Sequence, residues 1–343
     1  MNIKIKDIAQ RANVSSATVS LALNNKPGIS KATRQKILRI ARSLRDERDK
    51  QHRFTQAGRG AIRFLKIVKH GQILNRDHEV FISRYIDALE QEARQHGYNL
   101  EINTFNTSDI HETIAHIKDA AIDGLIVLGT ELETKDLKPF EHIDIPIGFI
   151  DTRFNFKQFD FVDMDNIQAV SQIVQHFIDH QHREIGFIGS SENARNFELR
   201  HVGFQEALKY FGLPYERTRI FFVSSTFDGA YADMLEMLKK GVKFPSALFC
   251  ANDLIAYGCI KAFKEMDVNV PEDVSIIGFD DLPMSAMMDP PLTTMKVSQR
   301  QIGRMAIQLL LERIHGGFNA PTIKISIGGR LICRKSVRTI PDS

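Results

Sequence analysis

The stretch IKIKDIAQRANVSSATVSLALNN, residues 3–25, decides the architecture of the N-terminal part of the chain. Its first half repeats apolar residues at helical spacing, which predicts a helix with one buried face: Ile5, Ile8, Ala9 and Ala12. Ser15 or Ser16 can then cap a second helix by accepting hydrogen bonds from its free backbone N–H groups. This second helix is predicted over Ser16–Asn24, with three residues buried: Val19, Ala22 and Leu23.

Two short helices joined by a tight turn form either a helix-turn-helix, with the second helix in the DNA major groove, or an ordinary helical hairpin. The outward face of the second helix is small and apolar or hydroxylic: Ser16, Ala17, Ser20 and Leu21. A third helix is predicted after Ser30, because an apolar stripe follows it at helical spacing: Ile37, Ile40, Ala41 and Leu44. Three helices of this length can enclose one small core.

The charge of the chain is unevenly distributed. Residues 1–63 hold 15 Lys and Arg against 4 Asp and Glu, a net charge of +11, while the remaining residues hold 30 against 38, a net charge of −8. A small basic module on a larger acidic body is typical of a nucleic-acid-binding protein. A solvated basic arm would account for the charge but not for the three-helix pattern in the same segment.

Short motifs in this segment resemble the headpiece of the LacI/GalR (lactose-repressor/galactose-repressor) family of transcriptional regulators. They are Ile5–Ala9, Ala12–Ser15, Thr18–Ser20, Leu23-Asn24, Ile29-Ser30 and Thr33-Arg34. The resemblance implies that the headpiece binds operator DNA. With the outward face of the second helix, it gives these predicted DNA contacts: Ser16, Ala17, Thr18, Ser20, Leu21, Asn24, Ser30, Thr33, Arg34 and, in the linker, Phe54.

Residues 47–63 lose the apolar period and are polar and basic, which predicts a linker between a DNA-binding domain at 1–46 and a body at 64–343. In the resembled family this region carries a hinge helix that inserts a Leu into the minor groove, usually announced by Tyr-x-Pro-Asn. This chain has Asp46–Asp49 instead. Phe54 is therefore either the apolar wedge between base steps or part of a plain tether.

The body alternates short apolar runs with amphipathic helices, a pattern that predicts buried parallel strands in a doubly wound α/β fold. The predicted strands are 64–68, 100–105, 124–128, 146–150, 185–188, 220–223, 247–250, 274–279 and 293–297, and the helices include 81–97, 166–180, 203–212 and 255–266. Since this is too many strands for one sheet, two lobes are expected, divided near 160–165. The longest apolar runs are too short to cross a bilayer, and the N-terminus has no secretory signal pattern.

Signatures of the common enzyme and metal sites are missing from the sequence. No Gly-x-Gly-x-x-Gly follows the first body strand, and no Walker A lysine, Gly-x-Ser-x-Gly or His-Glu-x-x-His occurs. Three cysteines without ligand spacing indicate reduced thiols in a cytosolic protein. We therefore expect no catalytic residues, no metal site and no cofactor.

The resemblance continues through the body, so that it covers nearly the whole chain. The matching pieces are Asp123–Ile126, Ile145-Pro146, Ile150-Asp151, Asp165-Asn166, His182–Gly189, Arg200–Phe204, Ala251–Asp253, Val270–Ser275, Gly278–Asp281 and Pro290–Thr294. They resemble the two-lobed regulatory core of the same family, which is similar to periplasmic sugar-binding proteins. The resemblance implies a small-molecule effector, sugar-like, in the cleft between the lobes. Position by position it implies these contacts: Asp151, Arg200, Asn252 and Asp280.

These polar residues follow predicted strands, where open α/β sheets bind their ligands. Asp and Asn supply acceptors, and Arg supplies a fork of donors, as sugar hydroxyls require. Phe81 is added as a ring that stacks on a sugar face, whereas Asp253 and Asp281 are expected to cap helices or brace loops. Arg76 and His78, which precede Phe81, hint at an acidic ligand. The rings of Phe154, Phe156, Phe161 and Phe197 are divided between cleft and core.

These observations predict a cytoplasmic, homodimeric repressor, with a tetramer left open, whose affinity for a palindromic operator is controlled by the effector. A sugar-binding or transport receptor is the first rival, opposed by the basic headpiece and the missing signal pattern. The second is an enzyme on a doubly wound fold, opposed by the missing catalytic motifs; turnover of the bound ligand would distinguish it.

Overall fold

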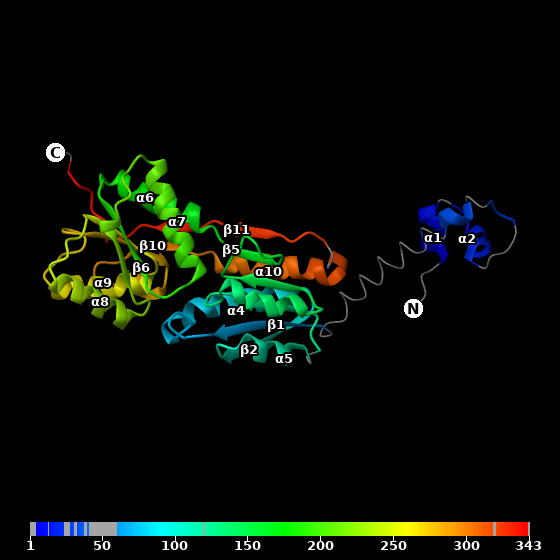
Figure 1. The fold of residues 1–343 in the computed structure, drawn as a ribbon. Coiled ribbons are helices and arrows are strands. Elements are labelled where there is room, and N and C mark those ends of the chain that lie inside the picture. The colour runs from blue at the N-terminus through cyan, green and yellow to red at the C-terminus, as the bar shows by residue number, and fades with distance from the viewer. Residues whose placement is uncertain are drawn as a thin grey trace. The chain divides into compact units, whose positions relative to one another are not determined.

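The computed structural model describes residues 5–12, 14–23, 28–30, 33–37, 40, 60–118, 121–317 and 320–341. The chain divides into two compact units that part between Arg59 and Gly60 in the sequence (Figure 1). The first is the predicted headpiece and the second the predicted body. Each is described by itself.

The headpiece contains α1 (Ile5–Ala12) and α2 (Ser16–Leu23), followed by helical residues at 33–37 and 40. One apolar cluster joins the three segments: Ile8, Ala9, Ala12, Val19, Ala22 and Ile37, with Val14, Ile29 and Ile40 packed against it. The helical spacing of these residues in the sequence explains why the three segments share a core. The predicted three-helix pattern is confirmed over the described residues.

The body consists of two α/β lobes, each built on a six-stranded sheet. The N-terminal lobe contains β1 (Gly60–Val68), η1 (Arg76–His78), α4 (Glu79–Gln95), β2 (Tyr98–Asn106), α5 (Ile110–Lys118), β3 (Gly124–Leu128), η2 (Thr134–His142), β4 (Ile147–Ile150), β5 (Asp160–Met164), α10 (Gln299–Glu312), η5 (Arg313–Gly317) and β11 (Lys324–Ile327). The C-terminal lobe contains α6 (Asn166–Asp179), β6 (Ile185–Ser190), α7 (Arg195–Tyr210), η3 (Arg217–Arg219), β7 (Ile220–Val223), α8 (Phe227–Lys239), β8 (Ala247–Cys250), α9 (Asp253–Glu265), β9 (Ser275–Asp280), η4 (Pro283–Ala286), β10 (Thr293–Lys296) and β12 (Arg330–Ile332).

The two sheets have equivalent strand orders, β11-β5-β4-β3-β1-β2 and β12-β10-β9-β8-β6-β7. The pairs from β1 to β11 through β3, β4 and β5 are parallel, as are those linking β7, β6, β8, β9 and β10, while β12 is antiparallel to β10. This is the doubly wound architecture that the alternation predicted. In such sheets the carboxyl ends of the strands meet at one edge, where ligands bind.

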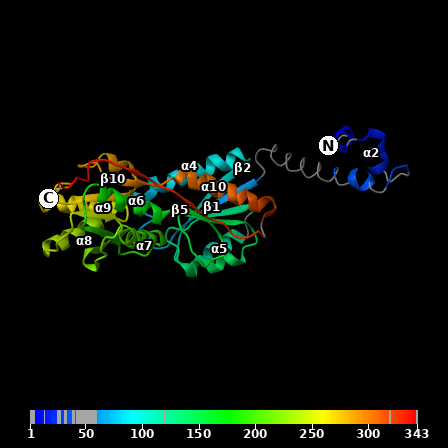
Figure 2. The ribbon, with the colours of Figure 1, turned by 90° about the horizontal axis from the view of Figure 1, so that it is seen from above.

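The chain passes between the lobes three times: after β5, after β10 and between β11 and β12. As a result α10, which comes late in the sequence, packs against α4 of the N-terminal lobe, as Figures 1 and 2 both show. Gly303 permits this close approach, because a Cβ there would lie 2.7 Å from the Cβ of Ala88. Three connections between two lobes form a hinge that guides their closure.

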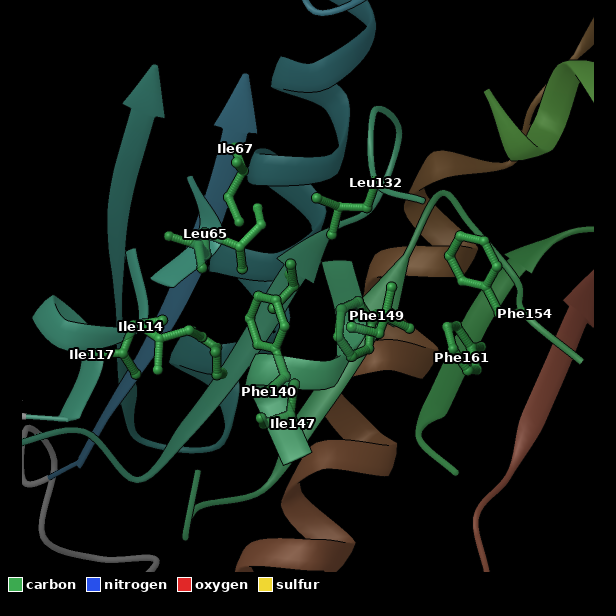
Figure 3. Packing of buried hydrophobic residues seen from close by; sticks show 14 of the residues in the cluster. Leu65, Ile67, Ile114, Ile117, Leu132, Phe140, Ile147, Phe149, Phe154 and Phe161 are labelled. Carbon is green, nitrogen blue, oxygen red and sulfur yellow. The ribbon is translucent and has the colours of Figure 1, made fainter. Parts of the chain in front are cut away.

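The core of the N-terminal lobe shows why its apolar runs became strands (Figure 3). Side chains from β1, β3, β4 and β5 meet those of α5 and the η2 segment in one cluster that includes Leu65, Ile114, Val127, Phe140 and Phe149. The ring centroids of Phe140 and Phe149 are 5.4 Å apart in an edge-to-face arrangement. Strands buried on both faces read in sequence as continuous apolar runs.

All nine predicted strands are present, and three observed strands, β5, β11 and β12, were not predicted. The run of β5 is interrupted in sequence by Asp160 and Asp163, both of which are nevertheless buried. The strand β1 begins at Gly60, four residues before the predicted start of the body at 64. The glycine and the charged Arg63 suggested a linker, but Ile62 is fully buried in the sheet.

Candidate functional site

The second helix of the headpiece begins with a hydroxyl cap. The backbone N–H of Thr18 donates to Oγ of Ser15 at 3.2 Å, and the two hydroxyl oxygens lie 2.8 Å apart. Ser15 is therefore the capping residue of the two that the sequence offered. Ser16 and Ala17, which follow it, are exposed at the start of α2.

The outward face of α2 is largely where the sequence placed it. Ser20 and Leu21 are partly buried, while Val19 and Ala22 face the core. The prediction that Leu23 is buried is wrong, since 43% of it is exposed. Val19 and Ala22, three residues apart, already form the inward stripe of this short helix, and Leu23 lies one helical step (about 100°) beyond them, facing outward.

The residues that follow α2 make a second cap. The N–H of Thr33 donates to Oγ of Ser30 at 3.1 Å, so Ser30 is the predicted N-cap. Nη1 of Arg34 donates to the carbonyl oxygens of Leu21 and Ala22, at 3.5 Å each. These carbonyls belong to the last turn of α2, where cations are favourable. Two other predicted DNA contacts, Asn24 and Phe54, lie outside the described residues.

In the body, the predicted effector residues converge at the carboxyl ends of the strands. Asp151 follows β4, Asp280 ends β9, Asn252 follows β8 and Arg200 lies in the second turn of α7 after β6. With Phe81 from α4, four of the five line one small cavity: Phe81, Asp151, Arg200 and Asp280. Asn252 lies beside it, with its Nδ2 3.4 Å from Nε2 of the cavity residue His78.

Arg200 is held rigidly by its contacts within the C-terminal lobe. Its Nη1 donates to the carbonyl of Ala251 at 2.6 Å, its Nε to Oδ1 of Asn166 at 3.1 Å, and its Nη2 to Oδ1 of Asp280 at 3.5 Å. The guanidinium carbon lies 3.6 Å from the ring centroid of Phe279. Both Arg200 and Asp280 belong to this lobe, and both line the same side of the cavity.

Asp151 of the N-terminal lobe lines the opposite side of the cavity. Tyr85 donates its hydroxyl to Oδ1 of Asp151 at 3.1 Å, and Thr130 donates to Oδ2. The backbones of Asp151 (φ 57°) and Asp280 (φ 115°) are both in the left-handed region, which is unfavourable for a residue other than glycine. Such conformations persist where the surroundings hold them and often mark binding sites.

A further carboxylate, that of Asp163 at the end of β5, was not predicted. Nδ2 of Asn196, on α7, donates to the Asp151 carbonyl at 3.1 Å and lies 3.3 Å from Oδ1 of Asp151 and from Oδ1 of Asp163. Asn196 thus ties the C-terminal lobe to two carboxylates of the N-terminal lobe. Asp163 was missed because the sequence shows it only as an acid within a short apolar run.

Burial dominates the proton affinity of these carboxyls. It raises the pKa of Asp163 to about 7, with a further contribution from the charge of Asp151. Burial also raises the pKa of Asp151 and raises that of Asp280 well above its usual range, although Arg200 opposes both shifts. Each unit of pKa shift corresponds to about 1.4 kcal/mol of differential stabilisation. The site therefore binds protons more readily than free aspartate does.

The aromatic and histidine candidates divide between cavity, core and surface. Phe81 is buried in the lining with its ring edge-to-face on Tyr85, and Phe197 also lines the cavity. Burial lowers the pKa of His78 to about 4, so this cavity residue is neutral near pH 7. Arg76 is 92% exposed along its side chain and outside the lining, so it does not support an acidic ligand. Phe154 and Phe161 belong to the core, and Phe156 is 97% exposed.

The loop that forms the cavity wall is fixed by one buried carboxylate. Glu131 accepts backbone N–H groups from five residues of the loop after β1, at 2.8–3.3 Å: Lys69, His70, Gly71, Ile73 and Leu74. Ile73 and Leu74 line the cavity. No local sequence pattern indicates this role, because Glu131 lies about sixty residues from the loop that it holds.

Asp253 and Asp281 have the bracing roles predicted for them. Asp253 accepts hydrogen bonds from Leu282 N, Ser285 Oγ and Thr294 Oγ1 at 2.6–2.8 Å. Asp281 pairs with Arg334 at 2.7 Å. Neither lines the cavity.

The cleft is closed in this structure. The cavity between the lobes has a volume of about 30 Å³, room for about two water molecules. Hydrogen bonds join the lobes beside it, from Ser225 Oγ to the Gln72 carbonyl at 3.0 Å and from Arg84 Nη1 to the Asp281 carbonyl at 3.3 Å. A ligand the size of a sugar therefore requires the lobes to separate before it can enter.

Within the part of the chain that the structure describes, no helix is both long and apolar enough to span a membrane.

Comparison with known proteins matches both units. Residues 4–45 match the family model described as "Bacterial regulatory proteins, lacI family", and residues 174–337 match "Periplasmic binding protein-like domain". The "HTH-type transcriptional repressor PurR" of Haemophilus influenzae (strain PittEE) is 30% identical over 344 residues, covering 98% of this chain and 99% of the relative. The protein of the same name from Pasteurella multocida (strain Pm70) is 28% identical, covering 98% of each chain.

Solved structures share the fold. A transcriptional regulator CelR–cellobiose complex superposes with a TM-score of 0.72 at 22% identity, over 98% of this chain and all of the other. The lac repressor dimer bound to operator and the anti-inducer ONPF superposes with a TM-score of 0.71 at 21% identity, with the same coverage. At these identities the likeness establishes the fold alone.

Proposed function

Since this chain belongs to the LacI/GalR family of transcriptional regulators, we propose how its residues divide the work of an effector-controlled repressor. The protein is a sequence-specific DNA-binding repressor that binds operator DNA as a homodimer and responds to a small molecule. We assign DNA binding to a domain at 1–46, coupling to the linker at 47–63, and effector binding and dimerisation to the body. Residues 60–63 begin the first strand of that body.

The DNA-reading surface is the start of α2. Ser16 and Ala17 are exposed there, with Thr18, Ser20 and Leu21 beside them. None of these side chains can make the bidentate contact by which Arg reads guanine, so apolar contact with thymine methyl groups and hydroxyl hydrogen bonds are expected. Ser30, Thr33 and Arg34 are proposed to lie against phosphates, with Asn24 and the linker residue Phe54 as further contacts.

The effector site is the cavity between the lobes, and one observation carries this proposal. Arg200 and Asp280 from one lobe and Asp151 from the other meet at the carboxyl ends of their strands, with Phe81 in the lining and Asn252 adjacent. Carboxylates and a guanidinium fork can hold several hydroxyl groups, and a ring can stack on the apolar face of a sugar. We therefore favour a sugar-like effector over a purely apolar ligand.

Control would pass from the cleft to the DNA in three steps. Effector binding changes the angle between the lobes through the three connections of the hinge. The change alters the dimer interface and the linkers, and with them the spacing of the two headpieces. A palindromic operator requires a spacing of about one helical turn, so its affinity for the dimer changes.

The site supports binding rather than turnover. The relatives are named as repressors, and a regulator of this family acts where operator DNA is, so we propose a cytoplasmic location. A sugar-binding or transport receptor would not need a DNA-binding headpiece, which this chain has. An enzyme would convert the ligand that stabilises the protein, so unchanged ligand after prolonged incubation distinguishes the two.

Variants of the cavity test this assignment. A ligand at about 100 times its dissociation constant raises the free energy of unfolding by about 2.7 kcal/mol. Arg200→Ala and Asp280→Asn should each lose most of that gain, because a hydrogen bond to a charged group contributes about 1.5–3 kcal/mol. Both should still bind operator, since the headpiece is a separate unit. A variant that kept the full ligand-induced rise in melting temperature would show that the site lies elsewhere.

A further inference from the structure

The cavity between the lobes has more acidic than cationic side chains at its wall. Asp151 lines it from the N-terminal lobe and Asp280 from the C-terminal lobe, while Asp163 is linked to Asp151 through the lining residue Asn196. Among the described residues that line the cavity, Arg200 supplies the one guanidinium near these three carboxyls. His78 supplies no positive charge near pH 7, because burial holds its pKa at about 4. Lobe closure thus brings carboxyls together from both sides with only one cation.

The guanidinium of Arg200 already donates hydrogen bonds within the C-terminal lobe. Arg200 donates to Ala251 O at 2.6 Å and to Asn166 Oδ1 at 3.1 Å, and its plane rests on the ring of Phe279. Its approach to Asp280 is long, at 3.5 Å, and among the described residues it makes no hydrogen bond to Asp151 or Asp163. In the described parts of the chain, the hydrogen-bond donors to Asp151 and Asp163 are all neutral: Tyr85, Thr130, Asn196 and the backbone N–H of Met164.

One oxygen of this cluster lacks even a neutral donor. Asp163 is 1% exposed, and within the described parts of the chain its buried Oδ2 has no hydrogen-bond partner. A buried acceptor without a donor destabilises the folded state. Burial, which disfavours the charged form, also raises the pKa values of Asp151, Asp163 and Asp280, and the charge of Arg200 only partly opposes this. A ligand that brings N–H donors and positive charge would relieve both penalties.

We propose that the effector is a polyhydroxylated compound bearing an ammonium group, of the amino-sugar class, and that the ammonium group lies between Asp151 and Asp280. Its hydroxyl groups use the remaining donors and acceptors of Arg200 and Asn252. Its positive charge bridges the carboxyls of the two lobes, which favours the closed arrangement. The proposal rests on the effector site assigned above and adds the charge of the ligand. It excludes the acidic ligand at which Arg76 and His78 hinted.

The test compares three sets of sugars that share their skeletons and differ in charge. They are glucosamine, galactosamine and mannosamine; glucose, galactose and mannose; and glucuronate, galacturonate and mannuronate. Melting temperature and calorimetric titration are measured on the full chain at pH 7.5. At least one amine should bind ten-fold or more tightly than its neutral parent, since hydrogen bonds to charged groups have that magnitude. Equal or tighter binding of a neutral or acidic sugar overturns the proposal and leaves the effector site in place. Binding by none of the three sets counts against the sugar-like effector itself.

A charge variant provides a second readout. Asp163→Asn should weaken binding of the amine by about ten-fold while changing the affinity for its neutral parent by less than two-fold. Asp144→Asn, which removes the same charge from an exposed position in the same lobe, is the matched control and should change neither affinity. Equal weakening of amine and parent by Asp163→Asn would show that Asp163 shapes the pocket without recognising charge, and would overturn the proposal.

Discussion

Replacing Asp163 by asparagine should stabilise the protein, and the gain should depend on pH. Burial and the neighbouring Asp151 raise the pKa of Asp163 from its usual 3.8 to about 7. Below pH 3.8 the carboxyl is protonated in both the folded and the unfolded protein, so it has no pH-dependent effect. Between pH 3.8 and 7 the unfolded chain releases this proton while the folded chain retains it, so folding loses free energy as the pH rises.

The size of the effect follows from the shift of about three pKa units. At about 1.4 kcal/mol per unit, the ionised carboxyl destabilises the folded state by up to about 4 kcal/mol above pH 7, and by about 1–2 kcal/mol at pH 5. Asparagine has the shape of the protonated acid and no charge. Its amide oxygen can still accept from Met164 N, as Asp163 Oδ1 does at 2.8 Å. The variant should therefore gain about 1–2 kcal/mol at pH 5 and about 4 kcal/mol at pH 8.

Urea denaturation of the full chain at several pH values between 5 and 8 measures this gain as a shift of the midpoint at constant slope. Asp144→Asn controls for the loss of one surface carboxylate and should follow the parent at every pH. A gain that is the same at pH 5 and pH 8 would mean that Asp163 does not hold its proton in the folded state. A loss of stability at pH 8 would mean that the carboxylate is ionised there and paired with a cation, which would refute the reasoning.

Three further predictions concern the headpiece and linker. Leu21→Arg should change the operator preference of a folded protein, because Arg reads guanine where Leu contacts thymine methyls; binding-site selection returning the same consensus would contradict this. Arg34→Ala should flatten the salt dependence of operator binding by about one unit and lower the melting temperature of the headpiece, because Arg34 also contacts the last carbonyls of α2; an unchanged slope in a salt titration would remove it from the phosphate contacts. If Phe54 is a wedge in the minor groove, Phe54→Ala should reduce both operator affinity and DNA bending in a gel assay; no change in either would assign it to a tether.

The sequence predicts those parts of this fold that repeat a simple period. All nine predicted body strands are present. Inner strands such as β3 and β9 are apolar at nearly every position because they are buried throughout. The headpiece was recognisable for the same reason, since Ile8, Ala12, Val19 and Ile37 mark inward faces at helical spacing. Leu23 is the exception: in a helix of only eight residues, one further apolar residue can fall outside the stripe.

Strand β5 shows where periodicity fails. Its sequence, Asp-Phe-Val-Asp-Met, contains two acids, yet every residue in it is buried. Asp160 is tolerated because Arg313 donates to both its oxygens, at 2.7 and 2.9 Å, from a helical segment about 150 residues later. A local pattern carries no information about a partner so distant in sequence, so the strand could not be recognised from its own residues.

The residues of the candidate site also fall into two groups, those that the sequence pattern could predict and those that it could not. Asp151, Asn252 and Asp280 could be predicted because each directly follows a recognisable strand, and the carboxyl ends of parallel strands share one edge. Tyr85, Thr130, Asn196 and His78 reach the same place from helices and loops whose positions depend on how the lobes close, which no local pattern encodes. Asp163 combines both difficulties. It lies in a strand that is hard to recognise because of its two acids, and its side-chain donor, Asn196, comes from the other lobe. Because an unpaired buried carboxyl destabilises the fold, its presence at the meeting point of the lobes is better explained by a ligand that supplies positive charge than by packing.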